Sequence, residues 1–449
     1  MPRVWRMFSS WLRLRRRLWR WRRAATPKAL KAEAPLRSQL FNVEQMELHG
    51  MALARAHRVH DQPGPERLLG RLHDNEGLLD DACSLLVRMV QDDMRITPAG
   101  EWLLDNSYLL EEQIHTARRH LPKGYSRQLP SLSLGPSAGL PRVFVLSMEA
   151  IPHGDGRIDT ETITRFIAAY QSITPLKLGE LWAIPIMLRL GLIENLRRMA
   201  VRVMRDGADH RLASEWAERL NATALESPKD VVLVIADMAR SNPPLSGAFV
   251  SELTRGLQGR GAAVSMPTAW VEQWAAAGGQ RIEELVHLGS QQQAGDQVSV
   301  SNSIARLRFL ANMDWRDFVE DMSVVEHTLR EDPAGTYALM DFATRDGYRH
   351  VVEKIAGRSG ASEQHVAGIA LSLAQAGMTQ AGMPAAGAHP GHIGYYLVDD
   401  GVAQTQAAVA ASGQARRPAR LGPRRIPLPG HLAPILVVTL RILQGLGAG

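Results

Sequence analysis

Apolar residues recur at three- and four-residue spacing through most of the chain from residue 43 to residue 376, and this spacing limits what the chain can fold into. It places apolar side chains on one face of an α-helix, whereas a half-buried strand needs strict alternation. We expect helices at 43–59, 66–91, 97–121, 141–151, 159–173, 178–204, 211–221, 229–239, 245–258, 268–276, 282–292, 300–311, 315–329, 345–356 and 362–376. No segment alternates between hairpin-type turns, so we predict an all-α fold, a multi-helix array of packed helix pairs.

The composition is that of an ordinary globular protein. The 449 residues are 45% hydrophobic and 22% charged, and this length allows a well-buried core. The single cysteine, Cys83, excludes an internal disulfide and a zinc site built from several cysteines. Because leucine and valine residues surround it in the sequence, we expect Cys83 to act as a small buried hydrophobe.

Positive charge is concentrated at the two ends of the chain. Residues 1–31 contain eleven Arg or Lys and no acidic residue, and a second basic run, 415–425, precedes the apolar stretch 432–440. The body between them is acidic. The composition therefore predicts no basic face and no nucleic-acid partner for the folded body.

The N-terminal basic arm, 1–40, interleaves tryptophan with arginine, which favours binding to an anionic lipid surface. The residues expected at the membrane surface are Trp5, Trp11, Arg15, Arg16, Arg17, Trp19, Arg20 and Trp21. The alternatives are an RNA-binding arm and a wrongly assigned start codon. No uninterrupted apolar run follows the charges, so a secretory signal is not expected.

The predicted organisation has four parts. The basic arm (1–40) precedes a helical domain (41–402), a basic linker (403–430) and the start of a truncated transmembrane segment (431–449). The apolar run 432–440 is too short to span a bilayer, and Arg441 interrupts it. The arginines before this run favour the cytoplasmic face of the membrane.

The stretch GEWLLDNSYLLEEQI (100–114) raises the main functional question, because it packs several acidic, amide and aromatic residues together. We expect one helix that opens at Thr97-Pro98 and ends near Leu121. On one helix Glu111 and Glu112 project about 100° apart, whereas Asp105 and Glu112 share a face roughly 10 Å apart along the backbone. Glycosidase carboxyl pairs lie about 5–9.5 Å apart, so nothing in this spacing demands catalysis.

A second stripe on this helix indicates packing instead. It consists of Leu103, Asn106, Leu110, Gln113, Ile114, Ala117 and Leu121. Asn106 and Gln113 would then be polar residues that fix the register of a packing seam. We therefore favour a packing role over a sugar-binding face, and both over catalysis.

Other motifs that carry chemistry are missing from the sequence. HGDGRID (153–159) lacks the ligand spacing of an EF-hand, and we expect Asp159 to cap a helix. No HExxH pair or phosphate-binding loop occurs, and no metal ligand or catalytic residue is assigned. No DxD occurs, and the one RxxRW match (17–21) lies within the arginine- and tryptophan-rich arm.

Several blocks together resemble the N-terminal region of bacterial cyclic β-1,2-glucan synthases. They are GEWLLDNSYLLEEQI (100–114), LPKGYSRQLPSL (121–132), TPLKLGELWAIPIMLRLGLIENLRRMA (174–200), the long block 298–353, which includes REDPAGTYALMDFATRDGYRHVVE, and HIGYYLVDDG (392–401). The resemblance covers roughly residues 43–401, in the order that the family has.

The resemblance implies an inner-membrane protein that makes periplasmic cyclic glucan from UDP-glucose with a divalent metal. This chain would match only the first part, before the transferase domain, so no cofactor is expected here. The implied partners are inner-membrane lipids and either β-1,2-glucan or the rest of the synthase. The implied role is to scaffold the transferase or to hold the glucan.

The resemblance also gives the aromatic and acidic residues a second interpretation, as contacts to glucan. The residues are Trp102, Asp105, Tyr108, Glu111, Glu112, Glu180 and Trp182. The alternative, which we favour, is that tryptophans in helices rich in leucine and isoleucine belong to the core. Two other hypotheses remain: a helical glycosidase that uses Asp105 with Glu111 or Glu112, and a membrane-surface interaction module.

Overall fold

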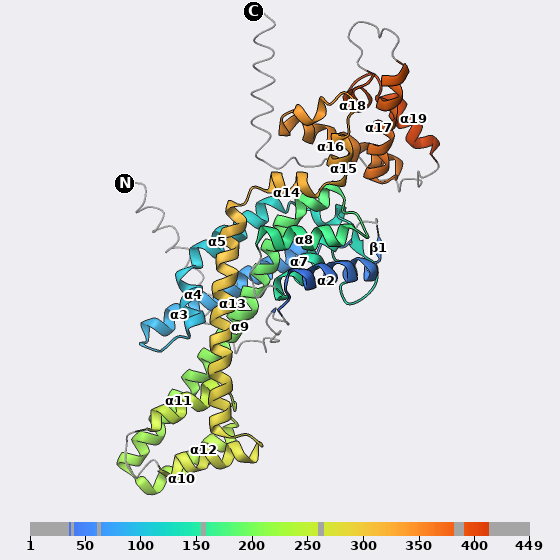
Figure 1. Ribbon diagram of the computed structural model, residues 1–449. Helices are drawn as coiled ribbons and strands as arrows, with labels where there is room; N and C mark the ends of the chain where they lie inside the picture. Colours follow the sequence, from blue (N-terminus) through green and yellow to red (C-terminus); the bar gives the residue numbers. More distant parts are fainter. Residues whose placement is uncertain are drawn as a thin grey trace, which may run out of the picture. The chain divides into compact units, whose positions relative to one another are not determined.

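The computed structural model describes residues 36, 40–60, 64–153, 159–258, 265–380 and 390–412 (Figure 1). The described part is all-α, as predicted. One short antiparallel pair accompanies the helices: β1 (Val59–His60) pairs with β2 (Ser131–Leu132), and Val59 lies opposite Leu132. None of the described helices combines the length and the apolar character that crossing a bilayer requires.

The elements follow one another without any larger sheet. The longer helices are α2 (Val43–Ala56), α3 (Leu68–Gln91), α4 (Pro98–Asp105), α5 (Ser107–His120), α7 (Arg142–His153), α8 (Thr160–Gln171), α9 (Leu178–Glu226), α10 (Val231–Ser241), α11 (Gly247–Leu257), α12 (Ser265–Ala277), α13 (Ile282–Asn312), α14 (Trp315–Met322), α16 (Phe342–Ser359), α17 (Glu363–Gln380) and α19 (Val402–Ala411). The shorter ones are α6 (Tyr125–Gln128), η1 (Pro228–Asp230), α15 (Val324–Arg330), η3 (Tyr337–Leu339) and α18 (Ile393–Val398).

These helices form two compact units. Among the described residues, the first unit comprises 84–97 and 198–291, and the second comprises 36–83, 98–197 and 292–412 with the gaps given above. The first unit has a continuous apolar core built from α9, α10, α11, α12 and α13, in which Leu220, Met238, Phe249 and Leu253 are fully buried. Gly247 and Gly289 let α11 and α13 approach closely, because a Cβ on Gly247 would lie 3.0 Å from the Cα of Gly289.

In the second unit, α2 packs along α8. Asn42 begins α2 with a capping box, in which Asn42 and Gln45 exchange backbone and side-chain hydrogen bonds. Gly50 lies against α8, because a Cβ there would be 2.8 Å from the carbonyl oxygen of Phe166. Asp159 caps α8 by accepting a hydrogen bond from the Thr162 amide at 2.7 Å, as predicted.

The first half of α9 is the most buried segment of the second unit. Residues 183–197 are all buried, polar side chains included, so this part of the helix has no solvent face. Its polar residues find partners inside: Asn195 donates to Ser299 at 3.2 Å and to Ser303 at 3.1 Å, both on α13. Helices α15 to α19 contribute a separate apolar cluster that includes Leu329, Tyr337, Val366 and Ile393.

Several boundaries differ from the predicted ones. The segments expected at 178–204 and 211–221 are one helix, α9, and those at 282–292 and 300–311 are one helix, α13. The helix expected at 315–329 is divided at Ser323, whose hydroxyl accepts from the Glu326 amide and caps α15. Helix α19 crosses the expected linker boundary at 402. The predicted membrane-surface residues of the arm and the apolar segment 431–449 lie outside the described residues.

Candidate functional site

The stretch 100–114 is not a single helix. Helix α4 ends at Asp105 and α5 begins at Ser107, with Asn106 between them at φ −108° and ψ 15°. The side-chain amide of Asn106 donates to the Trp102 carbonyl at 2.8 Å, in competition with the helical hydrogen-bond ladder. The prediction of one continuous helix was therefore wrong. The separation of Asp105 and Glu112 that was calculated for one regular helix does not apply, because the two residues lie on different helices.

The predicted packing seam is confirmed. All seven residues of the stripe are buried, from Leu103 to Leu121. Asn106 Oδ1 accepts from Arg308 Nη2 on α13 at 2.6 Å, and Gln113 Oε1 accepts from Arg189 Nε on α9 at 2.8 Å. Burial lowers the pKa of Arg189 to about 10. These hydrogen bonds connect α4 to α13 and α5 to α9, and they fix the register in which the helices pack.

The opposite side of α4 and α5 is exposed. Tyr108 is 79% exposed and Trp102 37% exposed, and the carboxylates of Asp105, Glu111 and Glu112 are on the surface as well. Five of the seven proposed glucan contacts therefore remain accessible. An open surface of this kind can hold a sugar by ring stacking and hydrogen bonds.

The other two proposed glucan contacts belong to the interior. Glu180 is fully buried at the start of α9, where its carboxylate accepts from the Lys177 amide at 3.0 Å and from Arg142 Nε at 2.9 Å. Arg142 Nη2 forms a second, shorter contact to Glu180 and also donates to the Pro175 carbonyl. Trp182 is half-buried, and its ring packs edge-on against the Phe342 ring, with ring centres 6.3 Å apart. Glu180 and Trp182 thus lie among interior residues. The favoured interpretation of the tryptophans as core residues is supported for Trp182 and wrong for Trp102.

A group of paired charges, most of them buried, was not predicted from the sequence. It joins α14, α15 and α16 and consists of Glu320, Glu326, Asp346, Arg330, Arg345 and Arg349, which we call the arginine–carboxylate network. Its centre is Arg349, which is fully buried, donates to Glu320 and Asp346 at 3.0 Å each, and also contacts Glu326. Three arginines face three carboxylates, so the charges balance.

Tyr337 completes this network from η3. Its hydroxyl donates to Glu326 Oε2 at 2.6 Å. Burial alone would raise the pKa of Glu326, but hydrogen bonds from Tyr337 and Arg330 and the charge of Arg349 outweigh that effect and hold the pKa below its usual value. Glu326 therefore stays ionised at neutral pH, paired within the fold.

Asp332 is the second unpredicted centre. Its buried carboxylate accepts from the amides of Thr336 and Tyr337 at 3.1 Å each, from the Ile393 amide at 2.9 Å, and from His392 Nδ1 at 2.8 Å. Burial opposes ionisation, but the hydrogen bonds from Ile393 and His392 dominate and lower the pKa of Asp332. One side chain thus joins the end of α15 to the start of α18.

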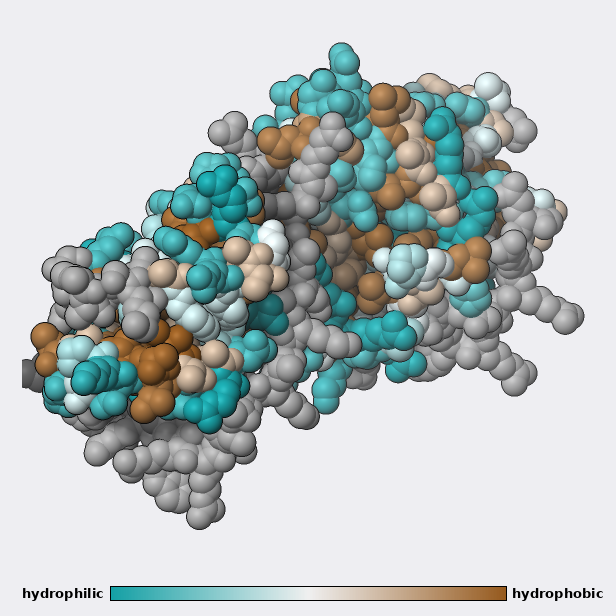
Figure 2. Space-filling view, turned by 90° about the horizontal axis from the view of Figure 1, so that it is seen from below, coloured by the Kyte–Doolittle hydropathy of each residue, from teal (hydrophilic) through white to brown (hydrophobic). Residues whose placement is uncertain are grey.

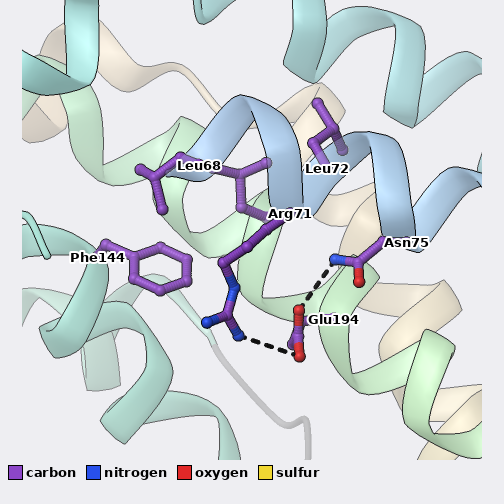
Figure 3. Close-up of a pocket in the computed structure, with 7 residues that line it drawn as sticks. Leu68, Arg71, Leu72, Asn75, Phe144 and Glu194 are labelled. Carbon is purple, nitrogen blue, oxygen red and sulfur yellow. Dashed lines mark hydrogen bonds and ion pairs between the residues drawn. The ribbon is translucent and has the colours of Figure 1, made fainter. Parts of the chain in front are cut away.

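The cavity shown in Figure 3 lies between α3, α7 and α9 in the second unit. Glu194 accepts from Asn75 at 3.0 Å and pairs with Arg71 at 3.2 Å, and the guanidinium of Arg71 lies 5.8 Å from the centre of the Phe144 ring. The volume is about 10 Å³, which is room for a single water molecule. A glucose ring does not fit there.

Comparisons with known proteins show what this chain is similar to. No family model matches the chain. Over 367 residues, however, the chain is 33% identical to "Cyclic beta-(1,2)-glucan synthase NdvB" of Rhizobium meliloti (strain 1021). The chain corresponds to a section of a cyclic β-1,2-glucan synthase. The match covers 81% of this chain and 13% of that relative, so the chain spans about an eighth of the relative's length.

In this section of the synthase, the blocks that carry the resemblance coincide with the structural centres described above. The block 298–353 contains the whole arginine–carboxylate network and Asp332, and HIGYYLVDDG begins with the histidine that contacts Asp332. The many Glu, Arg and Asp residues of this region are the sequence feature that could have indicated the network. Which of them pair depends on how α14, α15 and α16 pack, and the sequence does not show this.

Proposed function

We propose that this chain is a non-catalytic helical region of a cyclic β-1,2-glucan synthase, and that it scaffolds the membrane transferase or holds the growing glucan. The observation that carries the proposal is the state of the buried carboxylates. Glu180, Glu194, Glu320 and Glu326 are each paired with one or more arginines inside the fold. Such pairing holds these four carboxylates in place within the fold, whereas a general acid needs access to substrate.

The location belongs to the same proposal. We infer that the chain acts at the cytoplasmic face of the bacterial inner membrane, where the synthase uses UDP-glucose to make periplasmic glucan. The basic arm 1–40 would dock on anionic lipid, and the rest of the synthase and the glucan would be its partners. UDP-glucose and its metal would be bound elsewhere in the complete synthase.

Within this proposal, the exposed side of α4 and α5 is the part that fits a glucan. Trp102 and Tyr108 present aromatic surface, and the carboxylates of Asp105, Glu111 and Glu112 accept hydrogen bonds from sugar hydroxyls. Figure 2 shows a face on which hydrophilic and hydrophobic residues are interspersed, as on an ordinary protein surface.

The test is to incubate the full 449-residue chain with linear β-1,2-glucan and to measure both binding and release of reducing ends. We expect no hydrolysis, in the original chain and in Glu112→Gln alike. If glucan is held at α4 and α5, then Tyr108→Ala weakens binding. Hydrolysis that disappears in Asp105→Asn or Glu112→Gln would instead establish the glycosidase alternative and contradict the scaffold proposal.

A further inference from the structure

Two histidines and one glutamate meet between α2 and α7 in the second unit. His49 lies on α2, and Glu149 and His153 lie four residues apart on α7, which places them on one face of that helix. One nitrogen or oxygen of each side chain lies within 4.8 Å of those of the other two. All three residues are partly exposed, so an ion from solvent can reach them.

The spacing fits a small divalent metal ion. Zinc binds histidine nitrogen and carboxylate oxygen at about 2.0–2.2 Å in a tetrahedron, which separates neighbouring ligand atoms by about 3.3 Å. His49 Nε2 and Glu149 Oε2 are 3.2 Å apart, close to that separation. The ligand atom of His153 lies within 4.8 Å of both.

The rings are held in place by aromatic neighbours. Phe41 stacks on His153, with ring centres 3.8 Å apart and planes 9° apart. His49 packs edge-on against His153 at 4.8 Å and lies 6.3 Å from the Phe166 ring. The Phe41 amide also donates to the His153 carbonyl at 3.0 Å. These contacts limit the conformational freedom that the ligands would lose on binding.

Glu149 carries the negative charge that a cation requires. The hydrogen bond from His49 lowers the pKa of Glu149 although burial acts in the opposite direction. The carboxylate is therefore ionised at neutral pH. A metal ion would take the position between His49 and Glu149 that a proton occupies when the histidine is charged.

We propose that His49, Glu149 and His153 bind one divalent transition-metal ion of the zinc class, with a fourth coordination position open to water. Two histidines and one carboxylate with an open position are a ligand set that catalytic zinc sites and non-haem iron sites use. The site is independent of the proposed scaffold role, which needs no metal. It would cross-link α2 and α7 and add stability when occupied.

The test uses the full chain without an affinity tag, stripped of metal by chelator and titrated with Zn²⁺ by calorimetry. We expect one Zn²⁺ to bind per chain. When Co²⁺ is used instead, we expect the intense visible absorption bands of tetrahedrally coordinated Co²⁺. Glu149→Gln, His49→Ala and His153→Ala should each weaken Zn²⁺ binding at least about tenfold, because changes to the partners of metal ligands already cost 10–100-fold. Zn²⁺ should raise the Tm of the original chain but not that of Glu149→Gln.

His73→Ala is the matched control. His73 also faces a glutamate, with its Nδ1 3.7 Å from Glu76 Oε2, but it belongs to no three-residue ligand group among the described residues. Its loss should leave Zn²⁺ affinity unchanged. Glu149→Gln nearly conserves shape at a partly exposed position, so it decides the question even if a histidine variant fails to fold. Absence of one-to-one binding, or equal affinity in Glu149→Gln, would overturn the proposal and leave a His49–Glu149 ion pair.

Discussion

At the scale of single residues, Arg349 shows how this protein manages buried charge. Its guanidinium is fully buried among Glu320, Glu326 and Asp346 and lies 5.1 Å from the centre of the Phe342 ring. Removing one partner of a buried ion pair leaves an uncompensated charge in the interior, which costs far more than the pair itself contributes. Substitution of Arg349, at the centre of the network, should therefore destabilise the fold.

We predict that Arg349→Met lowers the free energy of unfolding by about 3–5 kcal/mol, measured by urea denaturation. The matched control is Arg240→Met, because Arg240 is a mostly exposed arginine whose partner, Asp237, lies on the same helix surface. Its loss should cost less than about 1 kcal/mol. Similar losses in the two variants would show that the network does not stabilise the fold.

Glu363 makes stability depend on pH. Burial raises its pKa from 4.5 to about 7, and the nearby charge of Glu353 acts in the same direction, although the Leu178 amide donates to its carboxylate at 2.8 Å. Between these two pKa values the folded state holds a proton that the unfolded state has lost. Stability from this group is therefore complete below pH 4.5 and falls as the pH rises towards 7.

Glu363→Gln is the variant that isolates this effect. The amide keeps an oxygen that can accept from the Leu178 amide but cannot titrate. Urea denaturation at a series of pH values should show a smaller decrease in stability between pH 4.5 and 7 in the variant. An identical slope in both proteins would mean that Glu363 has the same pKa folded and unfolded.

At the scale of elements, the sequence predicts where helices exist better than where they end. The sequence predicts a break in α13 at 293–299, where polar residues such as Ser299 interrupt the apolar pattern, but the structure places Ser299 against Asn195 in the interior. In α9, Gly207 resembles a break, but the structure uses it for close packing: a Cβ there would lie 2.9 Å from Met89 Sδ.

The site residues follow the same rule. Packing along 103–121 was predictable because it depends on spacing within one segment. The Glu180–Arg142 pair and the arginine–carboxylate network were not, because their members meet through tertiary contacts. His49 and Glu149 are 100 residues apart, and no local motif connects them.

Close helix packing gives a prediction at this scale. Gly50→Ala adds a Cβ 2.8 Å from the Phe166 carbonyl oxygen, so α2 and α8 must separate, and we expect a loss of about 1–3 kcal/mol. Gly77→Ala in α3 is the control, since nothing lies within 4 Å of its added Cβ and alanine favours the helix by about 1 kcal/mol. The Tm should therefore fall in Gly50→Ala and rise in Gly77→Ala. Equal Tm values in the two variants would contradict the packing argument.

At the scale of the whole molecule, the described chain consists of two units, each with its own apolar core. In the second unit, the buried carboxylates of Glu180, Glu194, Glu320 and Glu326 are paired with arginines. By sequence, positive charge is most concentrated in the basic arm, with eleven cationic residues and no acidic one in 1–31.

The last prediction concerns this arm. Each Lys or Arg near an anionic surface contributes about 1 kcal/mol, so deletion of residues 1–31 should abolish co-sedimentation with phosphatidylglycerol vesicles. Because the attraction is electrostatic, high salt should release the original chain, and neutral phosphatidylcholine vesicles should bind it weakly. Equal sedimentation of the shortened chain would show that the arm is not the anchor. Sedimentation that persists in high salt would instead assign binding to apolar insertion, for which the stretch 432–440 is the next segment to delete.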